Sequence, residues 1–347
     1  MRSEFVAPPV RSGPLTVRCY ERGDEVGILQ LFHRVFGDDG VKRSLESWRW
    51  QYQECPAGRQ VVVGVDEDSG RIVSQYAAIP VRFTVAGEEC IFAQAVDSMV
   101  DPNWRRSHSC CNAFLATARR YFELCPTDPH YRVCYGFPNR QALVVGCRHL
   151  RYSPTVRPVP TLFLNLFESA ALSNGVADEP DSVCIEPCES FGSFADALWD
   201  RLRSEYPMSA VRDSVFLDWR FAGAPVPYLC HRVVDAASGE PRGLFVLREG
   251  WRSPNILAVA EIFLAPGDRD ALRAVLTTAL RVARSGDFTR IEMWLPRRHP
   301  NFRLARELGM RVESSLMTCV SRCFRWSESS RWSLRNCYYT MADCDVL

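Results

Sequence analysis

The sequence contains an internal repeat, because three short patterns occur twice in the same order. Trp48-Arg49-Trp50 resembles Trp219-Arg220-Phe221, which lies 171 residues later. The stretch 95–102 matches 259–266 at an offset of 164 residues, and Pro138-Asn139 matches Pro300-Asn301 at an offset of 162. Chance would rarely keep three matches collinear, so the sequence predicts one fold used twice.

Both copies also carry the same order of secondary-structure signals. Each predicts a strand, a helix, two strands joined by a glycine-containing turn, a fourth strand, a helix, a strand and a helix, with strand-like segments at its end. The ranges are 15–20, 24–36, 60–66, 71–80, 91–100, 109–122, 132–136 and 139–150 in the first copy, and 182–186, 193–206, 228–235, 243–248, 256–264, 268–284, 290–295 and 301–308 in the second.

These ranges divide the chain into two domains and a linker. We predict an N-terminal domain over residues 1–166 and a C-terminal domain over 182–347. Between them, residues 167–181 are rich in Ala, Ser, Asn, Asp and Glu, which is typical of a linker. The aromatic and acidic tail, 332–347, either crosses back over the domain interface or is a frayed terminus.

Composition supports two globular domains and excludes several function classes. The length of 347 residues fits two domains of about 150 residues each. Hydrophobic residues make up 47% and charged residues 24%, which excludes a largely disordered chain. The net charge is +1, so no overall basic field would hold a nucleic acid or an anionic membrane. Lys42 is the only lysine, so an anion site must use arginines and backbone N–H groups.

The 15 cysteines predict reduced thiols more readily than a disulfide framework or a metal site. Cys184 and Cys188 are separated by three residues, as are Cys319 and Cys323, and neither pair has the C-x-x-C spacing of structural zinc sites. The start of the chain has no apolar core of signal-peptide length, and no run approaches the ~20 apolar residues of a membrane span. We therefore expect a cytoplasmic protein that binds no metal and no membrane.

The order of strands and helices resembles the acyl-CoA N-acyltransferase fold of the GNAT superfamily, present twice in tandem over nearly the whole chain. This resemblance implies an α/β (α+β) fold in which each domain is a mixed, mostly antiparallel sheet flanked by helices. Gly136-Phe137-Pro138-Asn139, followed by a helix and Leu150-Arg151-Tyr152, resembles the family's G-F-P-N and L-G-F/W signatures. In relatives an asparagine at the place of Asn139 contacts the cofactor.

The resemblance also implies where acyl-CoA would bind. The stretch 100–106 is similar to the family's V-x-P-x-Y-R-G, and the following loop and helix N-terminus hold the CoA pyrophosphate in relatives. Arg105 stands at the loop's Q/R position, whereas the loop's two glycine positions carry other residues. The cofactor-binding residues implied in this stretch are Val100, Arg105, Arg106, Ser107, His108, Ser109 and Cys110.

The second copy departs from the family in the same loop. Its stretch 266–270 reads Pro-Gly-Asp-Arg-Asp, and two carboxylates at a helix N-terminus would repel a pyrophosphate. We therefore expect the acyl-CoA site in the first copy.

Three residues are candidates for catalysis by this resemblance. In many relatives a carboxylate on the fourth strand of this order removes a proton from the acceptor amine, and Asp97 and Glu261 occupy matching places in the two copies. Tyr135 lies where the family holds its thioester, so its hydroxyl could protonate the leaving thiolate. Each has a structural alternative: a carboxylate that pairs with an arginine, and a tyrosine that packs in a strand.

The leading functional prediction is an acyl-CoA-dependent N-acyltransferase, most simply one that moves acetyl from acetyl-CoA to the amine of a sugar, an amino acid or a metabolite intermediate. One alternative is a Fem-like transferase that uses aminoacyl-tRNA, although the near-zero net charge disfavours a tRNA partner. Another is a catalytically degenerate binding or scaffold protein, suggested by the lost glycines of the first copy and the acidic loop of the second. The sequence does not indicate an oligomeric state.

Overall fold

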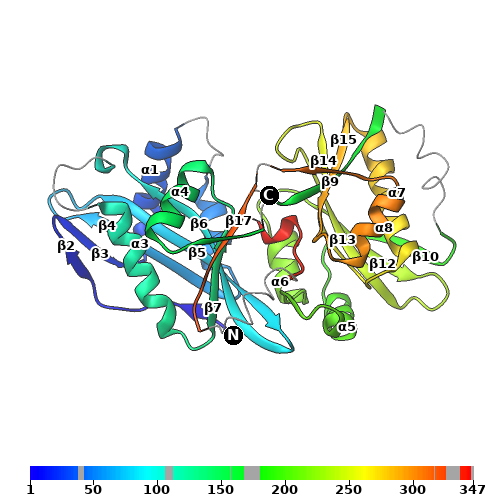
Figure 1. Cartoon of the computed structure of the whole chain (residues 1–347), viewed down its shortest axis with the longest axis horizontal. Helices are drawn as coiled ribbons and strands as arrows, with labels where there is room; N and C mark the ends of the chain where they lie inside the picture. The colour runs from blue at the N-terminus through cyan, green and yellow to red at the C-terminus, as the bar shows by residue number, and fades with distance from the viewer. Residues whose placement is uncertain are drawn as a thin grey trace. The chain divides into compact units, whose positions relative to one another are not determined.

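The chain forms two compact units, each built on one sheet (Figure 1). The structure, a computed structural model, describes residues 1–37, 43–105, 112–156, 158–167, 180–315, 317–325 and 337–344. Unit 1 comprises Met1–Arg82, Glu89–Thr155 and Cys319–Glu328, and unit 2 comprises Phe83–Glu88, Val156–Thr318 and Ser329–Leu347. Each unit has a mixed sheet flanked by helices, which confirms the fold class predicted from the sequence.

The sheet of unit 1 runs in the order β2-β3-β4-β5-β6-β7-β17-β8. Neighbouring strands pair antiparallel from β2 to β5, whereas β6 and β7 pair in parallel. Short β1 (Ser3–Glu4) adds to β4 in parallel. The strands are β2 (Val10–Ser12), β3 (Leu15–Cys19), β4 (Gly58–Asp66), β5 (Ile72–Val85), β6 (Glu88–Val100), β7 (Tyr131–Gly136), β17 (Cys319–Cys323) and β8 (Ser153–Val156).

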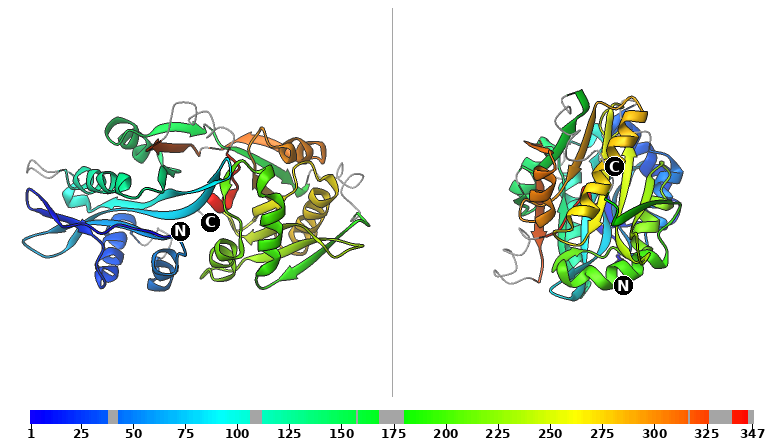
Figure 2. Two further views of the ribbon diagram at one scale, coloured as in Figure 1. Left: turned by 90° about the horizontal axis from the view of Figure 1, so that it is seen from below. Right: turned by 90° about the vertical axis from the view of Figure 1, so that its right-hand side faces the viewer.

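Helices cover both faces of this sheet. Figure 2 shows α1 (Asp24–Phe36) and α2 (Leu45–Trp48) on one face, with α3 (Ala113–Leu124) and α4 (Arg140–His149) on the other. A π-helical turn, Arg49–Gln53, continues α2 and packs against β4. Helix α3 begins later than the sequence predicts, because Asn112 caps it by accepting a hydrogen bond from the Leu115 N–H.

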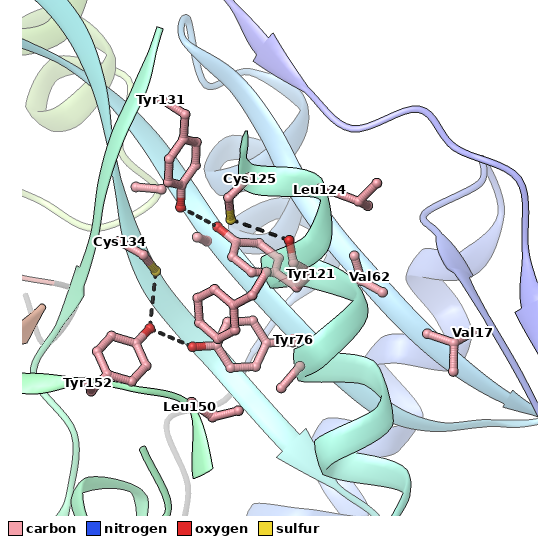
Figure 3. Packing of buried hydrophobic residues seen from close by; sticks show 14 of the residues in the cluster. Val17, Val62, Tyr76, Tyr121, Leu124, Cys125, Tyr131, Cys134, Leu150 and Tyr152 are labelled. Carbon is pink, nitrogen blue, oxygen red and sulfur yellow. Dashed lines mark hydrogen bonds between the residues drawn. The ribbon is translucent and has the colours of Figure 1, made fainter. Parts of the chain in front are cut away.

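The core of unit 1 contains a hydrogen-bonded group of tyrosines under α3 (Figure 3). The Tyr152 hydroxyl lies 2.6 Å from the Tyr76 hydroxyl and 3.1 Å from the Cys134 sulfur. The Tyr121 hydroxyl donates to Gln60 Oε1 at 2.7 Å and lies 3.1 Å from the Tyr131 hydroxyl. Burial raises the pKa of the Cys134 thiol to about 11, so this sulfur stays protonated at neutral pH. These buried polar atoms therefore partner one another inside an otherwise apolar core.

We expect Tyr152→Phe to destabilise unit 1 by about 1–3 kcal/mol, because it leaves the buried Tyr76 hydroxyl and Cys134 thiol without this partner. Urea unfolding measures the loss. The control is Val144→Ala on the exposed side of α4, which should change stability by less than about 0.5 kcal/mol. Equal stabilities of the two variants would contradict the network.

Unit 2 repeats the architecture with the sheet order β10-β12-β13-β14-β15-β9-β16. The pair β14–β15 is parallel, and the other neighbours are antiparallel. Short β11 (Met208–Ala210) pairs with Phe83–Val85, the end of β5 that belongs to unit 2. The strands are β10 (Val183–Cys188), β12 (Leu229–Asp235), β13 (Pro241–Glu249), β14 (Ile256–Leu264), β15 (Arg290–Trp294), β9 (Pro160–Asn165) and β16 (Arg311–Ser314); the helices are α5 (Ser193–Leu202), α6 (Ser214–Leu217), α7 (Arg269–Ser285) and α8 (Pro300–Glu307).

Each sheet takes one strand from the other half of the sequence, a feature that the sequence did not indicate. Strand β17, near the C-terminus, pairs with β7 of unit 1, where Val320 lies opposite Gly136. Strand β9, which lies before the second copy begins, is inserted between β15 and β16 of unit 2. Because these strands are internal to their sheets, each unit depends on residues from both halves of the chain.

The structure confirms the repeat and corrects its register, first at the tryptophan pattern. Helices α2 and α6 begin at Leu45 and Ser214, 169 residues apart, and each continues into a π-helical turn. Trp50, not Trp48, therefore occupies the position of Trp219. The turns after β4 and β12 are equivalent at the same spacing: Gly70 (φ 67°) and Gly239 (φ 74°) both adopt the left-handed conformation that favours glycine.

Candidate functional site

In both units, the two parallel strands separate partway along their length. Strand β6 pairs with β7 from Ile91 to Gln94, opposite Tyr131–Tyr135, and then continues to Val100 without β7. Strand β14 likewise pairs with β15 from Ile256 to Val259 and continues to Leu264. Beyond such a splay, the backbone N–H and C=O groups of β6 or β14 that face the departed parallel neighbour need other hydrogen-bond partners.

Asp97 lies on β6 beyond the splay of unit 1, at an irregular point of the strand. Its φ is +47°, a left-handed conformation that is uncommon outside glycine and that concentrates at functional sites. The Gln75 side chain on β5 donates to the Asp97 carbonyl at 2.9 Å. In β14 the register also shifts next to Glu261. Asp97 and Glu261, which the sequence comparison aligned, thus each lie at an irregular point of a strand, and these two strands, β6 and β14, correspond in the two units.

The Asp97 carboxylate is held by three side chains from the segment that includes α2. Arg43 donates to both oxygens at 2.6 Å, whereas Tyr52 (2.8 Å) and Gln51 (3.2 Å) donate to Oδ2. Burial, and then the neighbouring Asp97 charge, raise the pKa of Tyr52 well above 10, so its hydroxyl remains a donor. The oxygens therefore differ, because Oδ2 accepts three of these bonds and Oδ1 accepts one.

These three partners of Asp97 were not singled out by the sequence. The Trp-Arg-Trp pattern indicated that this segment is repeated, but it did not indicate a role for the residues that bind Asp97. Gln51 and Tyr52 both lie in the π-helical turn, whose hydrogen bonds span one residue more than those of an α-helix, and both are buried.

Four other predicted residues of unit 1 lie at the ends of β6 and β7 or just beyond them. Tyr135 is the last residue of β7 to pair with β6, and its side chain is buried. Asn139 caps α4 by accepting a hydrogen bond from the Ala142 N–H at 2.9 Å. Val100 ends β6, and exposed Arg105 follows the short 3₁₀ helix Pro102–Trp104. The remaining predicted residues, Arg106, Ser107, His108, Ser109 and Cys110, lie outside the described part of the chain.

Between Val100 and Arg105, Asp101 anchors the exit from β6. Its backbone N–H donates to the Val73 carbonyl at 2.8 Å, and its carboxylate accepts from Arg34 at 2.7 Å and from the Asn103 N–H at 3.0 Å. These bonds fix the direction in which the chain leaves β6 toward α3.

The splay of unit 2 has a different environment. Glu261 is 0% exposed, and its oxygens accept from Arg212 at 3.2 Å and from the Ile262 N–H at 2.9 Å. Burial raises the pKa of the Glu261 carboxyl above its usual range, although the Arg212 charge opposes this shift. Glu261 is thus fully enclosed, whereas the Asp97 side chain retains 11% exposure.

The loop that follows β14 is also closed by the chain itself. The Gly267 N–H donates to Asn301 Oδ1 at 2.8 Å, so Asn301 ties this loop to α8. Asp268 caps α7 by accepting from the Ala271 N–H at 3.0 Å, and Arg242 pairs with it at 2.8 Å. Asn139 and Asn301 therefore differ in position, because His299 is the residue that caps α8.

No metal centre or membrane helix is found in the part of the chain that the structure describes. Groups of three or more potential metal-ligating side chains are absent there. None of the helices in the same residues is both long and apolar enough to cross a membrane.

Comparisons with known proteins identify a family for part of unit 1. Residues 16–122 match the family model of an acetyltransferase (GNAT) domain. No curated protein sequence matches the chain.

Solved structures of low sequence identity share the fold. A GCN5-related N-acetyltransferase from Anabaena variabilis matches 89% of this chain and 72% of its own, with 11% identity and a TM-score of 0.63. A probable N-acyltransferase from Enterococcus faecalis has the same coverage, with 12% identity and a TM-score of 0.62. A tandem GNAT protein from the clavulanic acid biosynthesis pathway matches 90% of this chain and 100% of its own, with 12% identity and a TM-score of 0.57.

Proposed function

We propose that the chain, whose residues 16–122 match the family model of an acetyltransferase (GNAT) domain, is an acyl-CoA-dependent N-acyltransferase whose site lies in unit 1. The observation that carries the proposal is the contrast between the two splays. Past the splay of unit 2, the carbonyls of Ile262 and Leu264 accept hydrogen bonds from the chain's own Tyr338 and Tyr206. In unit 1 the Asp97 carbonyl also has a partner, Gln75, but the Asp97 carboxylate keeps 11% exposure whereas Glu261 has none.

The helix that follows each splay supports the same choice. Helix α3 has no acidic residue in its first turn, whereas α7 has Asp268 as its cap and Asp270 in its first turn. A helix N-terminus favours negative charge, and two carboxylates already satisfy that preference at α7. A pyrophosphate therefore fits α3 better than α7.

We assign the donor-binding residues accordingly. Arg105 and the following residues up to Cys110 would hold the pyrophosphate, while Val100 and Asn139 would contact the cofactor on either side of the splay. Acyl-CoA would supply an acyl group activated as a thioester, and acetyl-CoA is the simplest such donor. The acceptor would be the amine of a sugar, an amino acid or a metabolite intermediate, in a cytoplasmic setting.

In this proposal, Asp97 receives the proton that the acceptor amine loses as its nitrogen bonds to the acyl carbon. Arg43 and Tyr52 fix the carboxylate, and Oδ1, with one bond from these side chains, is the oxygen that has room for the proton. Tyr135, where β6 and β7 part, donates a proton to the departing sulfur as the thioester bond breaks. Glu261, buried and bonded to Arg212, has a structural part in unit 2.

A thermal-shift titration with acetyl-CoA tests the proposal. A ligand at 100 times its Kd should stabilise the fold by about 2.7 kcal/mol. Arg105→Glu places a carboxylate against the pyrophosphate, so we expect acetyl-CoA to bind more than tenfold more weakly, a loss of over ~1.4 kcal/mol.

The matched control is Arg269→Glu at the start of α7. Arg269 pairs with Glu307 at 2.9 Å, but both side chains are about half exposed, so losing the pair should cost little. We expect acetyl-CoA affinity to be nearly unchanged. Weakening by Arg269→Glu alone would place the site in unit 2, and no response to any acyl-CoA would favour a binding or scaffold protein.

A further inference from the structure

The C-terminal segment 337–344 is packed into unit 2 although it ends the described chain (red in Figure 1). Tyr338 and every residue from Thr340 to Cys344 are buried, and none of these is more than 4% exposed. The segment includes a short 3₁₀ turn, Met341–Asp343, that contacts β14. A terminus attached this closely behaves as part of the core, not as a frayed end.

Tyr338 lies where β14 has separated from β15. Its hydroxyl donates to the Ile262 carbonyl on β14, and its own N–H donates to the Met208 carbonyl at 2.8 Å. Its ring contacts Tyr206 and His299, with centroids 4.6 and 5.0 Å away. His299 caps α8, the helix that follows β15. One side chain of the segment thus bridges the two arms of the splay.

A buried charge cluster holds the other end of the segment. Asp343 accepts from Arg212 at 2.6 Å, and the same guanidinium donates to Glu261 at 3.2 Å and to the Ala210 carbonyl at 3.2 Å. Arg212 is fully buried, so its carboxylate partners replace the water that it has lost. Arg220, also buried, donates to the carbonyls of Ala342 and Cys344 at 3.2 Å each.

The segment is also shaped for this place by its own sequence. The Thr340 hydroxyl accepts from the Ala342 N–H, and the Asp343 carboxylate accepts from the Thr340 N–H at 2.9 Å. The hydrogen bonds of this capping box form the 3₁₀ turn, and the same bonds orient the Asp343 carboxylate toward Arg212. An aromatic residue and a carboxylate five residues apart are therefore presented together.

We propose that unit 2 is a peptide receptor whose resident ligand is the chain's own C-terminal segment, held by an aromatic group in the splay and a carboxylate on Arg212. In unit 1 we assign the edge of β6 beyond β7 to the acyl donor. In unit 2 the corresponding edge of β14 binds this segment. The inference stands apart from the proposed function, because none of its contacts involves Asp97, Arg105 or α3.

The test is rebinding in trans. A chain that ends at residue 336 should melt at a lower temperature than the full chain, and a synthetic peptide of residues 337–347 should restore the melting temperature. Peptides carrying Tyr338→Ala or Asp343→Ala should bind at least tenfold more weakly, and a scrambled peptide should not bind. An unchanged melting temperature after truncation, or equal binding by the scrambled peptide, would overturn the proposal.

Co-expression keeps the proposal testable where the shortened chain does not fold alone. The chain ending at 336 should then be recovered folded with an affinity-tagged 337–347 peptide, but not with the Asp343→Ala peptide. Equal recovery with both peptides would overturn the proposal. So would a second acetyl-CoA site that appears on truncation, because the segment would then be a cover over a donor site. Loss of all acetyl-CoA binding by the full chain contradicts only the proposed function.

Discussion

A chain that ends at residue 318 should lose the cooperative unfolding transition of unit 1. Such a chain lacks β17, which pairs with β7 and lies between β7 and β8 in the sheet. Its removal leaves the facing backbone groups of two strands without partners and exposes the core residues that Val320 covers. Thermal unfolding followed by circular dichroism, with limited proteolysis of residues 1–155, measures the effect.

Fragment complementation gives this prediction its control. Residues 1–179 carry β9 and residues 180–347 carry β17, so the co-expressed fragments should assemble and purify together, while each alone should be unfolded. A chain that ends at residue 325 retains β17 and should keep the transition of unit 1. A well-folded 1–179 fragment that needs no partner would contradict the exchange of strands.

Asp97→Asn should lower turnover by about 10²- to 10⁴-fold while acyl-CoA affinity is retained. The amide keeps the shape of the side chain and accepts a bond from Arg43 or Tyr52, but it cannot take a proton from the acceptor near neutral pH. The loss should shrink as pH rises, because more of the acceptor amine is already neutral. Steady-state kinetics from pH 6 to pH 10 give both results.

Asp66→Asn is the matched control for this variant. Asp66 is a buried carboxylate at the end of β4 that accepts from Ser69 in the β4–β5 turn. Its replacement should affect stability and leave the turnover of folded protein unchanged. If Asp97→Asn instead melts early and its folded fraction turns over normally, Asp97 is an ion-pair residue of Arg43 and the base lies elsewhere.

Local signals in the sequence were sufficient for much of the fold. Helix α1 occupies Asp24–Phe36 and β14 occupies Ile256–Leu264, both as the sequence predicts. The alternation of apolar and polar residues and the glycine turns are encoded within a few residues, so they can be read without the tertiary structure. The repeat strengthened these predictions, because the same order of elements is indicated independently in both halves of the sequence.

Long-range pairing could not be predicted in the same way. Whether β17 joins the sheet of its own half or the other depends on contacts between residues far apart in the chain, such as Val320 and Gly136. The partners of Asp97 have the same origin, since Arg43 and Tyr52 meet it only once α2 packs on the sheet. The ion pair of Asp343 with Arg212 joins residues 131 positions apart in the sequence and has no local signal.

The most direct test of the central claim is the structure of this protein crystallised with acetyl-CoA. We expect the thioester at the splay of β6 and β7, between Asp97 and Tyr135, and the pyrophosphate at the N-terminus of α3. In the same crystal, Tyr338 should still occupy the splay of β14 and β15. Acetyl-CoA bound between β14 and β15 in place of Tyr338, with the splay of unit 1 free of it, would contradict the account.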